Sequence, residues 1–312
     1  MELFEDAICL RTPERVPIAV QAGFYSALYA GITPYEAMYN YKKAGDAARK
    51  FNADFQTDTL TGAGQGPARA FDILDYKLYR WPGHGLDESA PFQCIESDYM
   101  KAGEYEALMD DPSGYFMRSY LPRVFGALEP LQQLNPPTDL LELPMLGPWL
   151  RVLARPEVRE AFAKLLAAGE AAEEWATACR AVNQEIVAEH GLPSGRGGFT
   201  KAPFDTLGDT LRGTRAMMAD RFRQPDRVRQ AIERWIPLAI EMGVRNSNQS
   251  KHPLISIPLH KGADGFMSDE DFRKFYWPSL KAVLLGLINE GVVPCLFAEG
   301  GYNDRLDVIA DS

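Results

Sequence analysis

Cysteine is scarce in this chain, which has four: Cys9, Cys94, Cys179 and Cys295. They lie far apart and never form the CxxC spacing that zinc fingers and redox motifs use. Disulfide frameworks are typical of small secreted domains, so we expect neither disulfides nor a cysteine zinc finger here. The sequence therefore predicts a protein of the reducing cytoplasm. Cys295 falls within an apolar run, where we expect it to be a small buried residue.

Positive charge is also in short supply, and long apolar runs are missing. Asp and Glu number 43 against 33 Lys and Arg, a formal net charge of −10. Proteins that bind nucleic acids or anionic membranes need a basic face, so we expect neither partner. No apolar run approaches the roughly 18 residues of a membrane-spanning helix. The start of the chain lacks the charged-then-apolar pattern of a signal peptide.

The most informative stretch begins with an apolar run over 254–259, which predicts a buried strand. His260 and Asp264 follow it in a glycine-rich turn. Ser268 then has the character of an N-cap, and an apolar stripe at spacings of three and four predicts a helix after it. A second buried strand is expected over 292–297, followed by Glu299 and Tyr302. Both strands thus end in side chains capable of chemistry.

The rest of the chain also alternates short apolar runs with longer amphipathic segments. A strand is expected over 15–20, followed by Gln21 and Phe24. Helices are expected from Pro34 towards Phe51, over 155–190 and over 225–242. Strands alternating with helices of this length favour a parallel sheet or barrel. Ligands of such folds bind beside the carboxyl ends of the strands, where these polar residues would lie.

Four segments, in order, resemble the uroporphyrinogen decarboxylase superfamily. They read RVPIAVQAG from Arg15, ADFQTDTL from Ala53, GFTKAPFDTLGDTLRG from Gly198 and DEDFRKFYWPSLKAVLLGLINEGVVP from Asp269. The resemblance implies a (β/α)8 TIM barrel, with residues 1–312 as a single domain and a helical insertion around 100–190. The chain ends soon after the strand at 292–297. A complete barrel would need at least one more βα unit, so we expect the barrel to be truncated at its C-terminus, with further ligands beyond Ser312.

The resemblance also implies roles for individual residues. Asp58 matches an aspartate that the family uses, and Asp209 stands where the decarboxylase has a tyrosine. Val20 and Phe24 replace two arginines that grip the carboxylates of uroporphyrinogen, and this argues against that substrate. Glu299 stands where methyltransferases of the superfamily place a zinc-binding cysteine. The resemblance therefore favours a methyltransferase that moves a methyl group from a small methylated compound, such as a methoxylated one, to cobalamin on a separate corrinoid protein.

In this hypothesis Glu299 and His260 hold zinc, while Asp58, Asp209 and His260 are the catalytic candidates. The residues expected to contact substrate are Gln21, Phe24, Asp264 and Tyr302. Other interpretations stay open. Glu299 could cap a turn, His260 could be a core histidine, and Asp209 could cap a helix. The chain could also be a decarboxylase that needs no metal, or a binding protein without catalysis.

Overall fold

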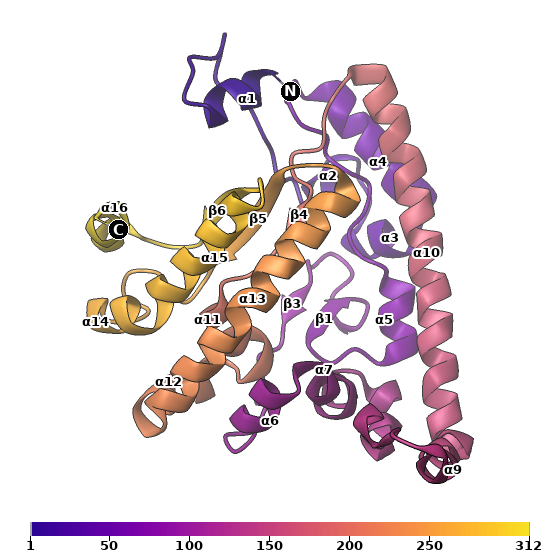
Figure 1. Ribbon diagram of the computed structural model, residues 1–312. Coiled ribbons are helices and arrows are strands. Elements are labelled where there is room, and N and C mark those ends of the chain that lie inside the picture. Colours follow the sequence, from indigo (N-terminus) through magenta and orange to yellow (C-terminus); the bar gives the residue numbers. More distant parts are fainter. Residues whose placement is uncertain (1, 312) are drawn as a thin grey trace. The chain divides into compact units, whose positions relative to one another are not determined.

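The computed structural model describes residues 2–311 and is 61% helical, with two small sheets of three strands each (Figure 1). The chain forms two compact units. The first unit contains residues up to 95 together with 122–195, and the second contains 96–121 together with 196 onward. The helical residues expected as one insertion around 100–190 are therefore shared between the two units. No helix within residues 2–311 is long and apolar enough to cross a membrane.

The first unit is built mainly from helices. Its sheet has the order β2-β1-β3, with β1 parallel to β2 and antiparallel to β3. The helices and strands, with α8 at the boundary of the unit, are α1 (Glu2–Ile8), α2 (Tyr25–Tyr29), α3 (Pro34–Tyr39), α4 (Tyr41–Asp54), α5 (Ala68–Leu74), β1 (Tyr79–Pro82), β2 (Gly85–Leu86), β3 (Gln93–Cys94), α8 (Leu121–Val124), η2 (Gly126–Gln133), η3 (Pro137–Asp139), α9 (Leu143–Arg151), η4 (Val152–Ala154) and α10 (Pro156–His190).

The helix predicted from Pro34 is confirmed as α3, and a capping box starts it. The hydroxyl of Thr33 accepts the main-chain N–H of Glu36, whose carboxylate in turn accepts the main-chain N–H of Thr33. The helix does not continue to Phe51 without a break. Asn40 has extended backbone angles and caps the next helix, α4, through the main-chain N–H of Lys43.

The helix predicted over 155–190 is confirmed as α10, which ends at Gly191 with a φ of +67°. The glycine-rich loop at 61–67 lies against it. A side-chain carbon at Gly64 would come within 2.7 Å of the Trp175 ring, and Asn183 accepts the main-chain N–H of Ala63. Close packing on α10 therefore accounts for the glycine at position 64.

The strand predicted over 15–20 is wrong. This segment has no ladder partner, and Val16 is 79% exposed. Pro17 removes a main-chain donor from its centre, which disfavours a strand. Ile18 is held instead by Asp58, whose main-chain N–H donates to the Ile18 carbonyl at 2.8 Å.

The second unit contains a parallel sheet of order β4-β5-β6. Its helices and strands are α6 (Tyr105–Asp110), α7 (Pro112–Tyr115), η1 (Phe116–Tyr120), β4 (Gly198–Phe199), α11 (Pro203–Asp205), η5 (Thr206–Leu211), α12 (Thr214–Arg223), α13 (Pro225–Ser250), β5 (Leu254–Leu259), α14 (Asp269–Asp271), η6 (Phe272–Tyr276), α15 (Trp277–Asn289), β6 (Val293–Ala298), η7 (Asn303–Arg305) and α16 (Leu306–Ala310).

The central strand β5 confirms the first predicted strand. Ile255, Ile257 and Leu259 along it are at most 3% exposed. Helix α13 connects β4 to β5 and α15 connects β5 to β6, and the two helices pack on each other. They approach closely at Gly243, where a side-chain carbon would come within 2.6 Å of Leu287. Helix α13, predicted over 225–242, runs on to Ser250.

The second predicted strand is confirmed as β6, but the prediction that it is buried is wrong. It lies at the edge of the sheet and pairs with β5 alone among the described residues. Cys295, expected to be buried, is exposed, and Phe297 is 48% exposed. Within residues 2–311 the strands close no hydrogen-bonded barrel. The TIM barrel therefore stays a prediction, while the βαβ succession of parallel strands is present.

Candidate functional site

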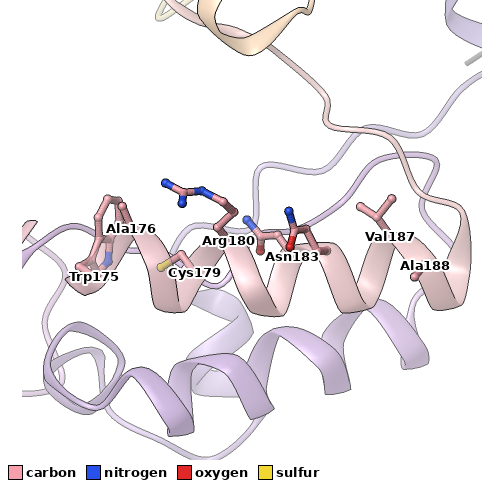
Figure 2. Close-up of a pocket in the computed structure, with 8 residues that line it drawn as sticks. Trp175, Ala176, Cys179, Arg180, Asn183, Val187 and Ala188 are labelled. Atoms are coloured by element: carbon pink, nitrogen blue, oxygen red, sulfur yellow. The ribbon is translucent and has the colours of Figure 1, made fainter. Parts of the chain in front are cut away.

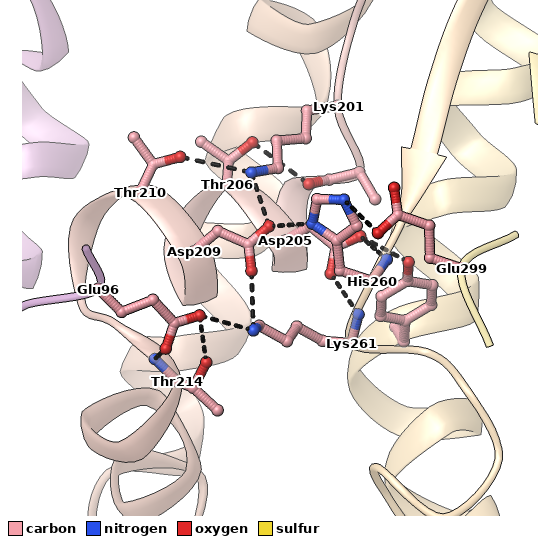
Figure 3. Close-up of polar contacts among 12 residues, drawn as sticks. Glu96, Lys201, Asp205, Thr206, Asp209, Thr210, Thr214, His260, Lys261 and Glu299 are labelled. Atoms are coloured by element: carbon pink, nitrogen blue, oxygen red, sulfur yellow. Dashed lines mark hydrogen bonds and ion pairs between the residues drawn. The ribbon is translucent and has the colours of Figure 1, made fainter. Parts of the chain in front are cut away.

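Polar side chains gather where the three parallel strands of the second unit end (Figure 3). Lys201 follows β4, His260 and Lys261 follow β5, and Glu299 follows β6. Because the strands are parallel, their carboxyl ends meet at one edge of the sheet, where ligands of open α/β sheets bind. Asp209 reaches the same edge from the helical segment η5, which follows β4.

Asp209 is the centre of this cluster. One carboxylate oxygen, Oδ2, lies 2.6 Å from Nζ of Lys201 and 2.5 Å from Nδ1 of His260. The other, Oδ1, lies 3.0 Å from Nζ of Lys261. The Asp209 side chain is only 11% exposed. A carboxylate so deeply buried has to be paired, and here it has three nitrogen partners.

The pKa values of the cluster follow from this geometry. Burial alone would raise the pKa of Asp209, but the hydrogen bond with His260 and the charges of Lys201 and Lys261 hold it well below its usual value. The hydrogen bond with Asp209 raises the pKa of His260 in spite of the burial of the ring. Burial opposes the charge of Lys261, yet Asp209 and Glu96 raise its pKa. The arrangement therefore favours an ionised Asp209 and a protonated His260.

A second buried carboxylate, that of Asp205, fixes the end of β5. It accepts the main-chain N–H of His260 at 3.1 Å and that of Lys261 at 2.9 Å. The hydroxyl of Tyr276 donates to it at 2.7 Å. Burial, with the neighbouring charge of Asp209, raises the pKa of Asp205. Asp205 thus holds the backbone that carries the histidine, while Asp209 holds its ring.

The carboxylate of Glu96 closes the cluster on the side of Lys261. Its Oε1 lies 2.9 Å from Nζ of Lys261 and accepts the hydroxyl of Thr214 at 2.6 Å. Glu96 is more exposed than Asp209, with 40% of its side chain accessible. Lys261 is therefore held between one buried and one accessible carboxylate.

The second ring nitrogen of His260, Nε2, is the part of the cluster best placed for chemistry. With Nδ1 bonded to Asp209, Nε2 is the nitrogen that gains or loses the working proton. It lies 3.5 Å from Oε2 of Glu299, whose side chain is 49% exposed. The imidazole itself is 30% exposed. A histidine that is fixed by a buried carboxylate and has part of its ring exposed can act as a general acid or base.

His260 and Glu299 are the two residues that the sequence indicated for zinc, and they do face each other. Among residues 2–311, however, no group of three or more His, Cys, Asp or Glu side chains is arranged to hold a metal ion. Catalytic zinc sites take three protein ligands and one open position. The described residues supply two donors and so do not fit a complete zinc site.

Asp264 and Tyr302, expected to contact substrate, connect the loops after β5 and β6. The main-chain N–H of Asp264 donates to the carbonyl of Gly301 at 2.7 Å. Its carboxylate accepts the N–H of Asp304 and lies 3.4 Å from Nε of the buried Arg305. Burial raises the pKa of Tyr302 to about 12. The contacts of Asp264 with Gly301, Asp304 and Arg305 order the loop that follows Glu299.

The remaining predicted residues belong to the first unit. Arg15 and the main-chain N–H of Ile18 donate to the carboxylate of Asp58 and lower its pKa to about 2. Phe24 is 9% exposed and packs in the core, with its ring 5.6 Å from that of Phe92. Gln21 is exposed. Their catalytic and substrate-binding roles stay predictions.

Sequence reasoning missed three of the central residues as candidates: Lys201, Asp205 and Lys261. Lys261 stands beside His260 and was available to the same argument about strand ends. Lys201 follows β4, a strand of two residues that starts with Gly198 and gives almost no periodic signal. Recognising the segment from Gly198 as strand, turn and helix would have brought both Lys201 and Asp205 to the same edge.

No protein-family model matches the chain, and no curated protein matches it. The resemblance to the uroporphyrinogen decarboxylase superfamily therefore stays a prediction from the four sequence segments.

Proposed function

We propose that this chain is an enzyme in which His260 transfers a proton to or from a small-molecule substrate. The observation that carries the proposal is the 2.5 Å contact between Nδ1 of His260 and the buried carboxylate of Asp209. Such a carboxylate fixes the tautomer and orientation of a histidine and stabilises its protonated form. The raised pKa of His260 suits a group that donates its proton near neutral pH.

The reaction we favour is methyl transfer from a methoxylated compound. In this step the methyl–oxygen bond breaks and its electron pair stays on the oxygen, which takes the proton from Nε2 of His260. The methyl group passes to a reduced corrinoid on a separate protein, and that acceptor supplies the electron pair of the new bond. Support comes from the sequence resemblance and from Glu299, whose Oε2 lies 3.5 Å from Nε2 of His260 and can help to hold the imidazole that donates the proton.

The second candidate is decarboxylation, favoured by the ammonium groups of Lys201 and Lys261 beside His260. The carbon–carbon bond breaks, carbon dioxide leaves, and the electron pair stays on the substrate carbon, which takes the proton of His260. The substrate must itself delocalise that pair, as a 3-oxo acid or a pyrrole-bearing acid does. We place the protein in the cytoplasm, because its four cysteines are free and thiols stay reduced there.

The test is turnover by the purified chain with two panels of compounds. Methoxylated aromatic and aliphatic compounds are offered with reduced cobalamin, and methylated cobalamin is followed by absorbance. In parallel, 3-oxo acids and uroporphyrinogen are offered and released carbon dioxide is measured. We expect turnover in the first panel that falls at least a hundredfold in His260→Gln, because general acid catalysis contributes about 10²–10⁴-fold.

A matched control is His190→Gln, which makes the same change at the end of α10. It should leave the rate unchanged. Turnover confined to the second panel and lost in His260→Gln would favour decarboxylation. Turnover that His260→Gln leaves intact would overturn the role of His260, and no turnover in either panel would count against both reactions.

A further inference from the structure

We propose that the first unit binds an uncharged, planar aromatic molecule in a cavity between α10 and the segment from α5 to β1. The cavity has a volume of about 480 Å³ and is lined only by residues of the first unit. Small-molecule sites occupy roughly 300–1,000 Å³ and are mostly apolar. This inference does not depend on the reaction proposed for His260, whose cluster belongs to the second unit.

Six of the fourteen residues that line the cavity are aromatic, and their rings pack both face to face and edge to face. The rings of Tyr76 and Phe125 stack with centroids 4.8 Å apart, whereas those of Phe71 and Trp81 meet edge to face at 5.6 Å. Aromatic pairs prefer offset stacks and edge-to-face contacts, so a planar ring entering this wall finds both geometries. The six aromatic residues of the wall are Phe71, Tyr76, Tyr79, Trp81, Phe92 and Phe125.

Charge and hydrogen bonding point to a neutral ligand. Among the described residues that line the cavity, none is Asp, Glu, Lys, Arg or His. The indole N–H of Trp81 donates to the hydroxyl of Tyr39 at 3.0 Å, and the amide N–H of Gln65 donates to the carbonyl of Gly23 at 2.7 Å. A charged ligand would lose its hydration without gaining a counter-charge, which is unfavourable. An aromatic ligand needs only the apolar surface that these rings offer.

The opposite wall is one face of α10. Leu165, Ala168, Gly169 and Ala172 line it at spacings of three, four and seven, which bring side chains to the same side of a helix. Three of these four residues are small, and this leaves the volume open. A side-chain carbon built at Gly169 meets no atom within 4 Å.

The hollow further along α10 lacks these properties (Figure 2). All of its lining residues come from this single helix, and they include the charged Arg180. It has no second wall to enclose a ring. The aromatic cavity is therefore the better candidate for a bound molecule.

The test uses N-phenyl-1-naphthylamine, a neutral aromatic probe that fluoresces in apolar surroundings. We expect saturable binding to the full chain and at least a tenfold loss of affinity in Gly169→Leu, whose side chain fills the cavity. Gly147→Leu is the control, because Gly147 of α9 also has open space around it but lies outside the cavity. Thermal unfolding of each variant shows that it is folded, and Ala172→Leu replaces Gly169→Leu if the latter fails to fold.

Competition then tests the aromatic character of the ligand. Naphthalene should displace the probe at a concentration at least tenfold lower than decalin, which has the same two rings without π electrons. Absence of saturable binding, or equal affinity of wild type and both filling variants, would overturn the proposed site. Equal competition by naphthalene and decalin would overturn the proposed ligand class.

Discussion

Replacing Asp209 with Asn is the most informative single change in the second unit. It keeps the size of the side chain and removes the negative charge that faces Lys201, His260 and Lys261. Lys261 keeps Glu96 as a partner, whereas the ring of His260 loses the group that most raises its pKa. We therefore expect two separate effects, one on stability and one on the titration of His260.

The effect on stability follows from burial. The side chains of Asp209 and Lys261 are 11% and 10% exposed, so water screens their attraction little. Removing one partner of a buried ion pair costs roughly 3–5 kcal/mol, because the other charge stays buried without its partner. Glu96 still pairs with Lys261, and the new amide can still accept hydrogen bonds. We therefore expect Asp209→Asn to lower the free energy of unfolding by about 3 kcal/mol, at the lower end of this range.

Two assays measure the two effects. Urea unfolding, followed by circular dichroism, gives the change in the free energy of unfolding. Histidine ring signals in an NMR titration give the pKa of His260. The chain has four histidines, so His260→Gln identifies the relevant signal by its loss. In Asp209→Asn the pKa of His260 should fall below its wild-type value.

The matched control is Asp226→Asn, because Asp226 is 82% exposed and pairs only loosely with Arg229, at 3.6 Å. Exposed ion pairs contribute roughly 0.2–1 kcal/mol, so this variant should lose at most about 1 kcal/mol. An unchanged pKa of His260 in Asp209→Asn would refute the coupling between the two side chains. A loss of stability no larger than that of the control would refute the importance of the buried pair.

Three further changes test local features of the fold. Arg15→Ala should leave the carboxylate of Asp58 with the main-chain N–H of Ile18 alone, raise its pKa from about 2, and speed proteolytic cleavage within residues 10–20 at least threefold. Gly64→Ala should lower the free energy of unfolding by about 1–3 kcal/mol, because the new methyl group would press on Trp175. Ser268→Ala should lower the free energy of unfolding, measured in urea, by about 1 kcal/mol, because the hydroxyl of Ser268 caps the helix that starts after it.

Each of these changes has a matched control. Arg11→Ala removes another N-terminal ion pair and should not change cleavage beyond residue 13. Gly147→Ala adds a methyl group where there is open space, and Ser113→Ala removes an exposed hydroxyl that caps no helix. A variant that behaves like its control would show that the contact assigned to it is unimportant.

Local signals in the sequence identified several helices and strands of both units well. The strand at 254–259, the cap at Ser268 and the helix from Pro34 each depend on a few neighbouring residues, and each is confirmed. The strand at 15–20 failed because an apolar segment also needs a partner strand, and Pro17 weakens its ability to pair. Whether β6 is covered depends on what packs beside it, and its own sequence does not contain that information.

The candidate site was predicted only in part, because its contacts join residues that are far apart in the sequence. His260, Asp209 and Glu299 were all named from the sequence, and the structure brings them together. That Asp209 binds His260 could not be predicted, because the two are separated by 51 residues and meet only through the parallel pairing of β4 and β5. Lys201 was missed because β4, the strand that precedes it, has only two residues and is too short to show the alternating pattern of a strand.

The pH dependence of stability distinguishes a working histidine–carboxylate pair from a mere packing contact. The pKa of His260 is raised in the folded state, so its contribution to stability is fully present below about 6.5 and is lost as pH rises through the folded value. The pKa of Asp209 is lowered, so its contribution is present above about 3.9 and is lost as pH falls through the folded value.

The pair should therefore stabilise the fold most between about pH 4 and 6.5. In urea unfolding of the wild type from pH 4 to 9, the free energy of unfolding should fall on the alkaline side. In His260→Gln this fall should be smaller. His190→Gln should keep the wild-type decline, because the pair is intact in that variant. A decline of equal size in wild type and His260→Gln would mean that the proton on His260 is not coupled to folding, and the 2.5 Å contact would then not be a charged hydrogen bond.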